Sequence, residues 1–402
     1  MLSTALHAAA AAALTLACAM WLWTGVLAAR VHRSVPRLAE LDVPPPARWP
    51  ALSVISAACN EADTLGPATE ARLRSDYPDL ELVLVDDRST DGTGALLDAL
   101  AARDPRAIVL HVHELPEGWL GKVHAMERGL QASRGEWVLF SDIDVHLSPD
   151  ALRRAVAFCE ARGVDHLAVF PRIEPGGLLR DTAIAAFGRL FTASVRTWEV
   201  ADPRKEASVG VGAFNLVRRA ALERIGGLRR LRLDVADDLA LGRLLKHSGA
   251  RVHAAQGRGA VELTWYRDLP EMARGLEKNL FAYAGRCELW RLVMAASLLV
   301  LVDAAPWVAL FSGTAWLAAL GAAALLTGLV TNAVMARWAG HRVLPALLMP
   351  LGTLLLAWIM VRAGVLGRRR GGVLWRGTLY PSELLREAMQ WEGGWRGGQQ
   401  RP

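Results

Sequence analysis

Apolar residues are concentrated in long uninterrupted stretches at both ends of the chain. Leu2 to Ala29 contains no Asp, Glu, Lys or Arg, and the same is true of Val343 to Val361. Leu292 to Ala336 contains a single charged residue, Asp303. Because a helix needs roughly 20 apolar residues to cross the hydrocarbon core of a bilayer, the pattern predicts one N-terminal and about three C-terminal transmembrane helices.

Basic residues predict how these helices are oriented. Arg30 and Arg33 follow the first apolar stretch, so the positive-inside rule places the polar middle of the chain in the cytoplasm. Three C-terminal crossings would then leave Arg368–Arg370 on the outer side, against the same rule. We therefore expect one C-terminal segment to be re-entrant or interfacial, with a break at Asp303–Pro306 or at Pro350. Asp303 itself is either a functional acid within the membrane or a helix cap near the headgroups.

The polar middle of the chain alternates short apolar runs with segments of helical spacing. Strands are expected at residues 51–58, 80–87, 107–113 and 136–142, and helices at 65–75, 92–103 and 122–133. This alternation predicts an α/β fold with a mostly parallel sheet that is covered by helices on both faces. In such sheets ligands bind at the carboxyl ends of the strands.

Polar residues follow three of the predicted strands. They are Asn60 and Glu61 after the first, Asp86 and Asp87 at the end of the second, and Asp142 and Asp144 after the fourth. A single aspartate after a strand usually forms a turn or caps a helix, which is the role expected of Asp91. Capping does not explain acids at three strand ends, so we expect them to line one crevice.

Residue types indicate the chemistry of that crevice. No glycine lies between Ala57 and Gly66 in the sequence, so the first strand lacks the glycine-rich loop that cradles phosphates in dinucleotide-binding proteins. Carboxylates can instead hold a divalent cation, and the cation can neutralise a diphosphate leaving group. Asp142 and Asp144 are two positions apart at a strand end, so both can reach one Mg²⁺ or Mn²⁺.

Composition narrows the range of partners. The chain has 402 residues, of which 52% are hydrophobic, and a net charge of +6 that comes almost entirely from arginine. The apolar stretches make an anionic membrane surface a better partner than nucleic acid, and the interleaved aromatic and basic residues of single-strand binders are absent from the sequence. The four cysteines are scattered, without the spacing of zinc sites or disulfide frameworks, in keeping with a reducing compartment.

Four ordered segments of the polar middle carry a family resemblance: SVISAACNEADTLG, VDDRSTDGT, SDIDVHLSPDAL and VADDLALGRLLKHSG. They are similar to the successive motifs of family 2 glycosyltransferases with a GT-A fold, over about Ser53 to Leu280. Membrane-anchored members, such as ceramide glucosyltransferases and bacterial carotenoid- or hopanoid-associated enzymes, share one N-terminal and several C-terminal helices. The tail Trp375–Tyr380 also resembles that of the bacterial relatives, except that Thr378 stands where they have arginine.

The resemblance implies roles for the residues on the donor side. Asn60 and Glu61 would border the nucleotide, and Asp87 would accept the N–H of a uracil-like base. Asp86 would either assist in this or simply end its strand. Lys122 would lie beside a phosphate, where its charge is suitable, with a solvated lysine at a helix start as the alternative.

The same resemblance implies the metal ligands and the catalytic base. Asp144 would contact the metal, and Asp142 the metal or the ribose. Asp238 would be the base that takes the proton of the acceptor hydroxyl as it attacks the anomeric carbon. Asp237 would cap the following helix, or Asp237 would be the base and Asp238 the cap. Asp234 is a weaker third candidate for the base.

The resemblance also favours the transfer of a single sugar. The region after Asp238 lacks the Gln/Arg-X-X-Arg-Trp motif of processive members, and Gly275–Asn279 is similar to a segment of non-processive bacterial enzymes. We therefore expect an inverting, metal-dependent transferase that moves one sugar from a nucleotide-sugar, UDP-linked, to a lipid hydroxyl at the inner (plasma) membrane. A processive polysaccharide synthase and an inactive membrane scaffold are the alternatives.

These patterns divide the chain into five expected parts. They are an N-terminal transmembrane helix (2–29), a GT-A catalytic domain (48–264), an amphipathic interfacial segment (265–290), a C-terminal transmembrane region (291–366) and a basic tail (367–402). Pro44–Pro46 would form a stiff linker between the first two parts.

Overall fold

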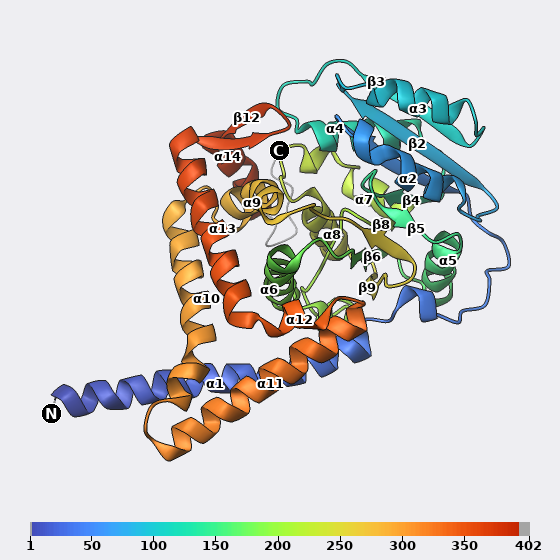
Figure 1. Cartoon of the computed structure of the whole chain (residues 1–402). Coiled ribbons are helices and arrows are strands. Elements are labelled where there is room, and N and C mark those ends of the chain that lie inside the picture. The colour runs from blue at the N-terminus through green and yellow to red at the C-terminus, as the bar shows by residue number, and fades with distance from the viewer. Residues whose placement is uncertain (1, 394–402) are drawn as a thin grey trace.

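The computed structural model describes residues 2–393 of the chain (Figure 1). An α/β part is built around a seven-stranded sheet, and long apolar helices lie beside it. The N-terminal end of the first helix points away from the α/β part. The chain thus divides into a compact polar body and a set of apolar helices attached to one side of it.

The central sheet has the strand order β3-β2-β1-β4-β8-β6-β9. The bounds of its strands are β1 Leu52–Ala58, β2 Leu80–Asp87, β3 Ala107–Val112, β4 Trp137–Phe140, β6 His166–Phe170, β8 Asn215–Arg218 and β9 Val252–Gln256. Strands β1 to β4 are parallel to their neighbours in this group, whereas β8 is antiparallel to both β4 and β6. The predicted α/β fold with a mostly parallel sheet is confirmed, and each of the four predicted strands is present.

Helices follow most strands of the α/β part, and others connect this part to the long apolar helices. Their bounds are α2 Ala62–Leu73, α3 Thr93–Ala101, α4 Gly121–Ala132, α5 Ala151–Arg162, α6 Leu178–Ser194, α7 Arg219–Ile225, α8 Asp237–His247, α9 Leu269–Lys278, α12 Val343–Leu347 and α14 Ser382–Gly393. Shorter helical turns occur at Leu38–Glu40, Thr197–Glu199 and Arg229–Leu231, and a π-helical turn at Asn279–Ala284. The three predicted helices correspond to α2, α3 and α4.

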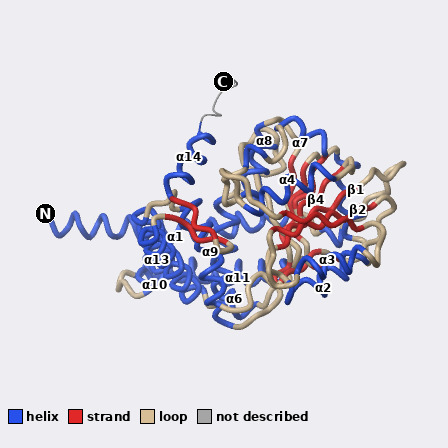
Figure 2. Tube along the Cα trace, turned by 90° about the horizontal axis from the view of Figure 1, so that it is seen from above, coloured by secondary structure: helices blue, strands red, loops and turns tan. Residues whose placement is uncertain are grey.

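Successive side chains along the strands point to opposite faces of the sheet and form one apolar layer on each face. Ile55 and Val83 pack with α4, α7 and α8, whereas Val54 and Leu139 face the other way and pack with α5. Leu84 packs with α2 and α3. Figure 2 shows α4, α7 and α8 on one side of the sheet and α2 and α3 on the other. Because both faces are covered, the strands are apolar almost throughout.

Two smaller sheets complete the structure. Strands β5 (His146–Leu147), β10 (Val261–Leu263) and β7 (Arg172–Ile173) form a three-stranded sheet, and β11 (Gly372–Trp375) pairs with β12 (Thr378–Pro381) in an antiparallel hairpin. The hairpin turns at Arg376 and Gly377, both with positive φ (48° and 78°). Two consecutive residues with positive φ are typical of the tight turns that match strand twist.

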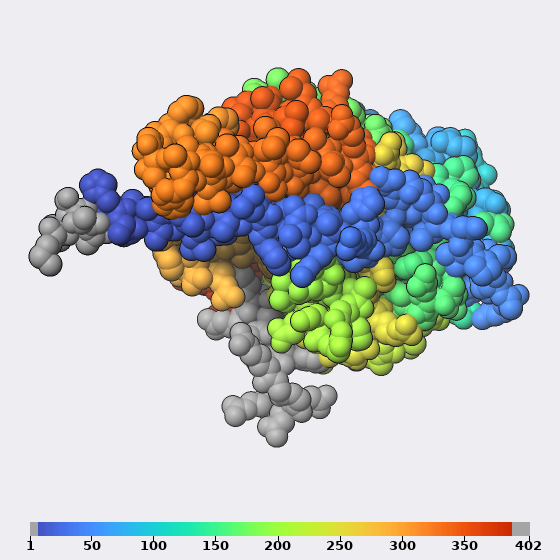
Figure 3. All heavy atoms as spheres, turned by 90° about the horizontal axis from the view of Figure 1, so that it is seen from below, coloured from blue at the N-terminus to red at the C-terminus, as the bar shows by residue number. Residues whose placement is uncertain are grey.

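Within residues 2–393, four helices are long and apolar enough to cross a membrane. They are α1 (Leu2–Ser34), α10 (Leu289–Leu310), α11 (Ala315–Ala339) and α13 (Met349–Arg370). One is N-terminal and three are C-terminal, as predicted. Helix α1 packs along α11, and α10 packs along α13. Figure 3 shows α1, in blue, running beside the orange C-terminal helices.

Several element boundaries differ from those expected from the sequence. Helix α1 continues to Ser34 rather than ending at residue 29, and α13 continues through the arginines to Arg370. Arginine is a good helix former, so α13 ends only at Gly371, whose φ of 69° caps it. The expected basic tail thus begins inside a helix, and its residues 394–402 lie outside the described residues.

Candidate functional site

The loops after β1 and β2 are joined at the carboxyl edge of the sheet. Asn60 accepts a hydrogen bond from the backbone N–H of Thr90 at 2.8 Å, and its own backbone N–H donates to Ser89 Oγ at 3.1 Å. Asn60 has a positive φ of 57°, a conformation that asparagine adopts more readily than most residues. The two loops therefore form one continuous wall at this edge.

Glu61 and Asp91 hold the starts of two neighbouring helices. The backbone N–H of Glu61 donates to Thr93 Oγ1 at 2.9 Å, and its carboxylate accepts from Thr64 Oγ1 at 2.9 Å. Asp91 accepts from Thr93 Oγ1 at 2.6 Å and from the backbone N–H of Ala62 at 3.1 Å. Of the two roles predicted for Asp91, the turn is confirmed, because the backbone N–H of Thr93 donates to Asp91 Oδ1 at 3.0 Å. Glu61 stays half-buried at the same edge of the sheet.

Asp86 is the last residue but one of β2, and its side chain faces the neighbouring strand β3. Its carboxylate accepts from the backbone N–H of Ser89 at 3.2 Å and pairs with Nδ1 of His111, in β3, at 3.1 Å. Hydrogen bonds first with Asp86 and then with Asp98 raise the pKa of His111. These contacts hold Asp86 against β3 and against the loop that follows β2.

Asp87 is fully buried and lies between arginines. Arg88 Nε donates to Asp87 Oδ1 at 2.8 Å, and Arg376 Nη1 lies 3.8 Å from Asp87 Oδ2. A Cβ atom at Gly121 would lie 2.5 Å from Asp87 Oδ2 and 2.5 Å from Arg88 Nη2. Glycine at this position therefore lets α4 begin directly against the acid.

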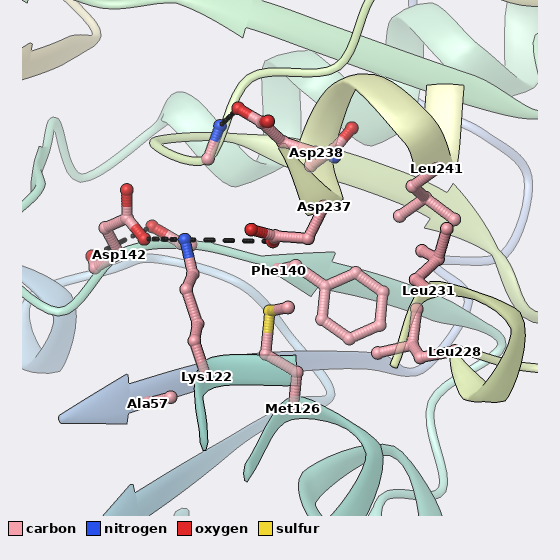
Figure 4. Close-up of a pocket in the computed structure, with 13 residues that line it drawn as sticks. Ala57, Lys122, Met126, Phe140, Asp142, Leu228, Leu231, Asp237, Asp238 and Leu241 are labelled. Atoms are coloured by element: carbon pink, nitrogen blue, oxygen red, sulfur yellow. Dashed lines mark hydrogen bonds and ion pairs between the residues drawn. The ribbon is translucent and has the colours of Figure 1, made fainter. Parts of the chain in front are cut away.

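Lys122, at the start of α4, connects acids from two other elements (Figure 4). Its Nζ donates to Asp142 Oδ1 at 2.6 Å and lies 3.9 Å from Asp237 Oδ2. Burial alone would lower the pKa of Lys122, but attraction to Asp142, Asp237 and Asp238 outweighs burial and raises it. Burial likewise opposes ionisation of Asp142, yet the charge of Lys122 holds the pKa of Asp142 below its usual value. Lys122 is therefore a paired lysine rather than a solvated one.

Arg72 of α2 supports the loop that follows β4. The residue is fully buried, and its guanidinium donates to the backbone carbonyls of Asp142 and Ile143 and to Ser141 Oγ. Burial lowers the pKa of Arg72 to about 10, so the side chain stays charged at neutral pH. Arg72 thus fixes the backbone between the two acids of this loop without occupying their carboxylates.

The surroundings of Asp144 disfavour the ionised form of its carboxyl group. Burial, followed by repulsion from Asp142 and Glu61, raises the pKa of Asp144 to about 7. Among the described residues, no three His, Cys, Asp or Glu side chains converge in a way that could hold a metal ion, so the protein alone offers no closed metal site. Two carboxylates with only oxygen donors do fit an open Mg²⁺ or Mn²⁺ site, in which phosphate oxygens and waters complete the coordination.

Asp237 and Asp238 begin α8 on the other side of a small cavity. Asp238 Oδ2 accepts from the backbone N–H of Gly212 at 2.9 Å, and Oδ1 from that of Leu239 at 2.8 Å. Burial and then the charge of Asp237 raise the pKa of Asp238 to about 6, and burial also raises the pKa of Asp237. The cavity is lined by both acids together with Lys122, Asp142 and Gly212 (Figure 4).

Glycines allow the segment before β8 to lie against the start of α8. A Cβ atom at Gly210 would lie 1.7 Å from the backbone oxygen of Asp238, which no relaxation of side chains could relieve. A Cβ atom at Gly212 would lie 2.8 Å from Asp142 Oδ2. The absence of these side chains therefore lets Asp142 and Asp238 share one cavity.

The hairpin β11–β12 reaches the same edge of the sheet although it is distant in sequence. Burial raises the pKa of Tyr380, and the backbone of Gly121 beside its hydroxyl opposes this shift. Lys278 Nζ lies 4.4 Å from the ring centroid of Trp375 and donates to the backbone oxygen of Val235 at 3.1 Å. After Lys122, the charges of Arg376 and Lys278 also help to lower the pKa of Asp142. The hairpin thus adds positive charge beside the acids.

Sequence reasoning did not identify Arg72, Arg88 or Arg376 as parts of this site. Arg72 lies in an ordinary helical pattern, and Arg88 is one arginine among many, so neither carries a signal in the sequence. Arg376 and Lys278 both lie within segments that resemble motifs of known enzymes, and that resemblance was the available signal. The structure brings the predicted residues to one edge, with Asp86 turned toward β3.

Comparison with known proteins gives the family of the α/β part. Residues 53–226 match the family described as Glycosyl transferase family 2, so the chain contains a domain of this family. The matched residues include β1 to β4 and every strand-end acid described above, and they stop before Asp237 and Asp238.

Several curated relatives match part of the chain. Succinoglycan biosynthesis protein ExoO of Rhizobium meliloti is 37% identical over 131 residues, which cover 31% of this chain and 36% of that protein. Polyprenol monophosphomannose synthase of Mycolicibacterium smegmatis is 36% identical over 32% of this chain and 47% of its own. Beta-monoglucosyldiacylglycerol synthase of Synechocystis is 26% identical over 55% of this chain and 47% of its own. The chain therefore spans between about a third and a half of these relatives.

A solved structure with a similar fold is that of mannosyltransferase PcManGT from Pyrobaculum calidifontis, in complex with GDP-Man and Mn²⁺. The two chains align with a TM-score of 0.51 and 22% sequence identity, over 90% of this chain and 99% of that one. The similarity establishes a shared fold, and the GT-A type of α/β fold expected from the sequence is confirmed.

Proposed function

We propose that this chain, which carries a glycosyl transferase family 2 domain, is an inverting enzyme that transfers a single sugar from a nucleotide-sugar to a membrane lipid. The donor would be UDP-linked, and the acceptor group a lipid hydroxyl. By their names, two of the relatives described above synthesise a polyprenol monophosphomannose and a monoglucosyldiacylglycerol, both of which are sugar-bearing lipids. The four apolar helices support an acceptor that is delivered from a bilayer.

One observation carries the proposal: Asp238 lies across a single small cavity from Asp142 and Lys122. An inverting transfer needs a base on one side of the sugar and a stabilised leaving group on the other. In our proposal Asp238 takes the proton of the acceptor hydroxyl while the hydroxyl oxygen forms a bond to the anomeric carbon. The bond from that carbon to the diphosphate breaks in the same step, and its electron pair leaves with the phosphate oxygen.

The acidity of Asp238 supports its role as the base. Its pKa of about 6 lies near neutrality because burial and the neighbouring charge of Asp237 disfavour the ionised form. A base is most effective when its pKa is close to the working pH, since it is then both ionised and able to hold a proton. Asp237, whose carboxylate faces Lys122, would orient the lysine and begin α8.

The remaining predicted residues form the donor side of the proposal. Asn60 and Glu61 would border the nucleotide, and Asp87 would accept the N–H of the base once the adjoining arginines adjust. Lys122 would bind a phosphate oxygen of the donor. Asp86 would act indirectly, through the loop that it holds.

Asp142 and Asp144 would hold Mg²⁺ or Mn²⁺ in this proposal. When bound, such an ion neutralises the negative charge that develops on the departing diphosphate. The raised pKa of Asp144 supports this assignment, because a cation would relieve the repulsion between the carboxylates. Arg72 does not engage either carboxylate, since it bonds only to the backbone and to Ser141 in this loop, whereas Lys122 donates to Asp142 Oδ1 and leaves Oδ2 for the ion.

We place the enzyme in the inner (plasma) membrane, with its α/β part in the cytoplasm. Arg30 and Arg33 at the end of α1 support this orientation by the positive-inside rule. Nucleotide-sugars are made in the cytoplasm, so the donor crevice would face its supply. Exposed leucines on α6, among them Leu178 and Leu190, would lie at the bilayer surface beside the acceptor.

A direct test uses the full chain reconstituted in lipid nanodiscs. The protein is incubated with radiolabelled UDP-hexoses, a bacterial lipid extract and Mn²⁺, with EDTA as a matched control, and the lipids are analysed by mass spectrometry. A mass gain of one hexose on a lipid, lost with EDTA, is the expected result. A polymeric product would instead identify a processive synthase. If no sugar is transferred from any UDP- or GDP-sugar, the alternative of an inactive membrane scaffold would be favoured.

A further inference from the structure

Two segments that resemble motifs of bacterial relatives meet beside the acids of the site, although they are far apart in the sequence. They are Gly275–Asn279, which spans the end of α9, and Trp375–Tyr380, in the hairpin. We propose that Lys278 is a positioning residue for the two acids that begin α8, and that Trp375 holds this lysine in place. The proposal rests on the sugar transfer proposed above and adds two residues that act through the base.

Lys278 is bonded to the backbone that leads into α8. Its Nζ donates to the backbone oxygen of Val235 at 3.1 Å and to Asn279 Oδ1 at 3.1 Å. Val235 is buried and lies just before Ala236 and Asp237, where α8 begins. Because a carbonyl group moves with its backbone, the ammonium group of Lys278 fixes the place from which both acids project into the cavity.

The aromatic ring of Trp375 lies over the same ammonium group. Nζ of Lys278 is 4.4 Å from the ring centroid, within the roughly 6 Å at which an aromatic face attracts a cation. Trp375 is half-buried in β11, which packs against α9, and Val373 of the same strand is buried. A carbonyl, an amide oxygen and an aromatic face therefore hold Lys278, and none of these three partners carries a negative charge.

Helix α9 gives Lys278 a fixed support. The carboxylate of Glu277, the preceding residue, is buried and pairs with Arg362 at 3.3 Å and with Arg370 at 2.5 Å, both in α13. Successive residues of a helix point about 100° apart, so Glu277 holds α9 on α13 while Lys278 reaches the site. The helix then changes to the π-helical turn Asn279–Ala284, a feature that is frequent at functional sites.

The positive charge of Lys278 acts on both acids of α8. Burial raises the pKa of Asp237, and the charges of Lys122 and then Lys278 oppose this. The same two lysines oppose the rise in the pKa of Asp238. Burial lowers the pKa of Lys278 itself, while the charges of Asp237 and Asp238 counteract this. The charged groups around the two acids are Lys122 of α4, Lys278 of α9, Asp142 in the loop after β4, and Asp234 just before α8.

The two lysines have different tasks in the proposed reaction. Lys122 binds a phosphate oxygen of the donor, so its charge is shared with the leaving group. Lys278 then remains as the cation that favours the ionised form of Asp238, which is the form that accepts the proton. Lys278 acts through the acids and not on the donor, so its loss should alter turnover and its pH dependence but not the binding of nucleotide.

Hydrogen–deuterium exchange tests whether Lys278 holds the start of α8, and it requires no turnover. In Lys278→Met, peptides that cover residues 232–240 should exchange about tenfold faster, because a hydrogen bond from a charged group is lost. Lys246→Met is the matched control, since Lys246 donates to the backbone oxygens of Val200 and Asp202 from the other end of α8. Unchanged exchange at residues 232–240 in Lys278→Met, or equal acceleration in both variants, would overturn the positioning role.

The pH profile of kcat/KM tests the effect of the charge on the base. Because a nearby cation favours an ionised carboxylate, Lys278→Met should move the acidic limb of the profile to higher pH by about one unit. Lys278→Arg keeps the charge and should retain the limb of the wild type, as should Lys246→Met. The affinity of Lys278→Met for UDP in the presence of Mn²⁺ should stay within about twofold of the wild type in calorimetry.

Two results of these measurements would contradict the proposal. One is an acidic limb that does not move in Lys278→Met, and the other is a loss of UDP affinity as large as the loss of kcat/KM, which would make Lys278 a donor ligand. A wild type that transfers no sugar would instead refute the proposed function, and the exchange measurement would still decide whether Lys278 holds the start of α8.

The role of Trp375 is tested separately with variants of the hairpin. Trp375→Leu should accelerate exchange at residues 232–240, and Trp375→Phe, which retains an aromatic face, should restore the rate of the wild type. Leu374→Ala is the matched control, because this neighbour in β11 is 50% exposed. If Trp375→Leu exchanges like the wild type, or no faster than Leu374→Ala, Trp375 does not hold Lys278.

Discussion

The ammonium group of Lys122 lies 2.6 Å from the carboxylate of Asp142, and this contact joins the start of α4 to the loop after β4. In the proposed reaction the same ammonium group binds a donor phosphate. Lys122→Met removes a charge-assisted hydrogen bond, which is worth about 1.5–3 kcal/mol. We therefore predict that KM for the nucleotide-sugar rises about ten- to a hundredfold in initial-rate kinetics.

Lys205 offers the matched control for this prediction, because it is an exposed lysine outside the site. Lys205→Met should leave KM unchanged, and Lys122→Arg should retain part of the affinity through its charge. Equal effects at the two lysines would argue against a phosphate contact by Lys122.

Replacing Asp238 with asparagine should abolish most of the turnover while preserving the fold. Asparagine can still accept from the backbone N–H of Gly212 but cannot take a proton. General-base catalysis contributes about 10²–10⁴-fold, so kcat should fall by that factor with donor affinity retained. Asp268→Asn, at the cap of α9, is the control that should keep full activity. A large loss in Asp237→Asn with none in Asp238→Asn would exchange the two roles.

The activity should depend on pH through the ionisation of Asp238. Its pKa is raised to about 6, and only the ionised carboxylate can accept a proton, so activity is lost as the pH falls through that value. We predict that kcat/KM falls about tenfold per pH unit below pH 6 and reaches a plateau above it. The profile is measured from about pH 4.5 to about pH 8 at saturating metal. A wild-type profile that is flat down to pH 4.5 would exclude Asp238 as the base.

Arg376 should contribute to nucleotide binding from the far end of the chain. Arg376→Ala removes a charge that lies 3.8 Å from Asp87 and helps to lower the pKa of Asp142. We expect UDP to bind about tenfold more weakly, a loss of about 1.4 kcal/mol, by calorimetry in the presence of Mn²⁺. Arg386→Ala, in α14, is the control, because its guanidinium bonds to Cys287 instead. Unchanged UDP affinity in Arg376→Ala would confine the hairpin to a structural role.

Asp303 lies within α10 and pairs with Arg189 of α6 at 3.0 Å, so it is not the helix cap that the sequence allowed. This ion pair should stabilise the junction of the apolar helices with α6. Asp303→Asn leaves the guanidinium without its charged partner, which costs on the order of 3 kcal/mol for a buried pair. The variant should therefore unfold at a lower temperature in detergent, as followed by tryptophan fluorescence. Arg189→Leu combined with Asp303→Leu should lose less stability than either single change, because no unpaired charge remains. A double variant that loses the sum of both single effects would contradict this account.

The strands and the acids that follow them were predictable because they depend on local pattern. The run from Leu80 to Asp87 was assigned to a strand with the bounds that the structure has, and Asp142 does reach the same cavity as Asp238. Such features follow from alternation and from the rule that parallel strands present their carboxyl ends together.

Residues that reach the site through tertiary contacts were not predictable in the same way. Arg72 supports Asp142 across 70 residues of sequence, and Arg376 approaches Asp87 from a hairpin beyond all the apolar helices. Asp303 carried a signal, as a charge in an apolar stretch, but its partner Arg189 lies in another helix 114 residues away. Pairings of this kind depend on which helices pack together, and the hydrophobic pattern alone does not predict that.

The position of the hairpin also has a consequence for biosynthesis. Strands β11 and β12 are translated after the four long apolar helices, so the ribosome has synthesised the whole α/β part before Arg376 and Tyr380 emerge. The nascent chain would therefore gain its last contacts to Asp87 and Gly121 only once the preceding helices are correctly inserted. Misinserted copies would remain incomplete at this edge, which would couple the onset of sugar transfer to successful membrane integration.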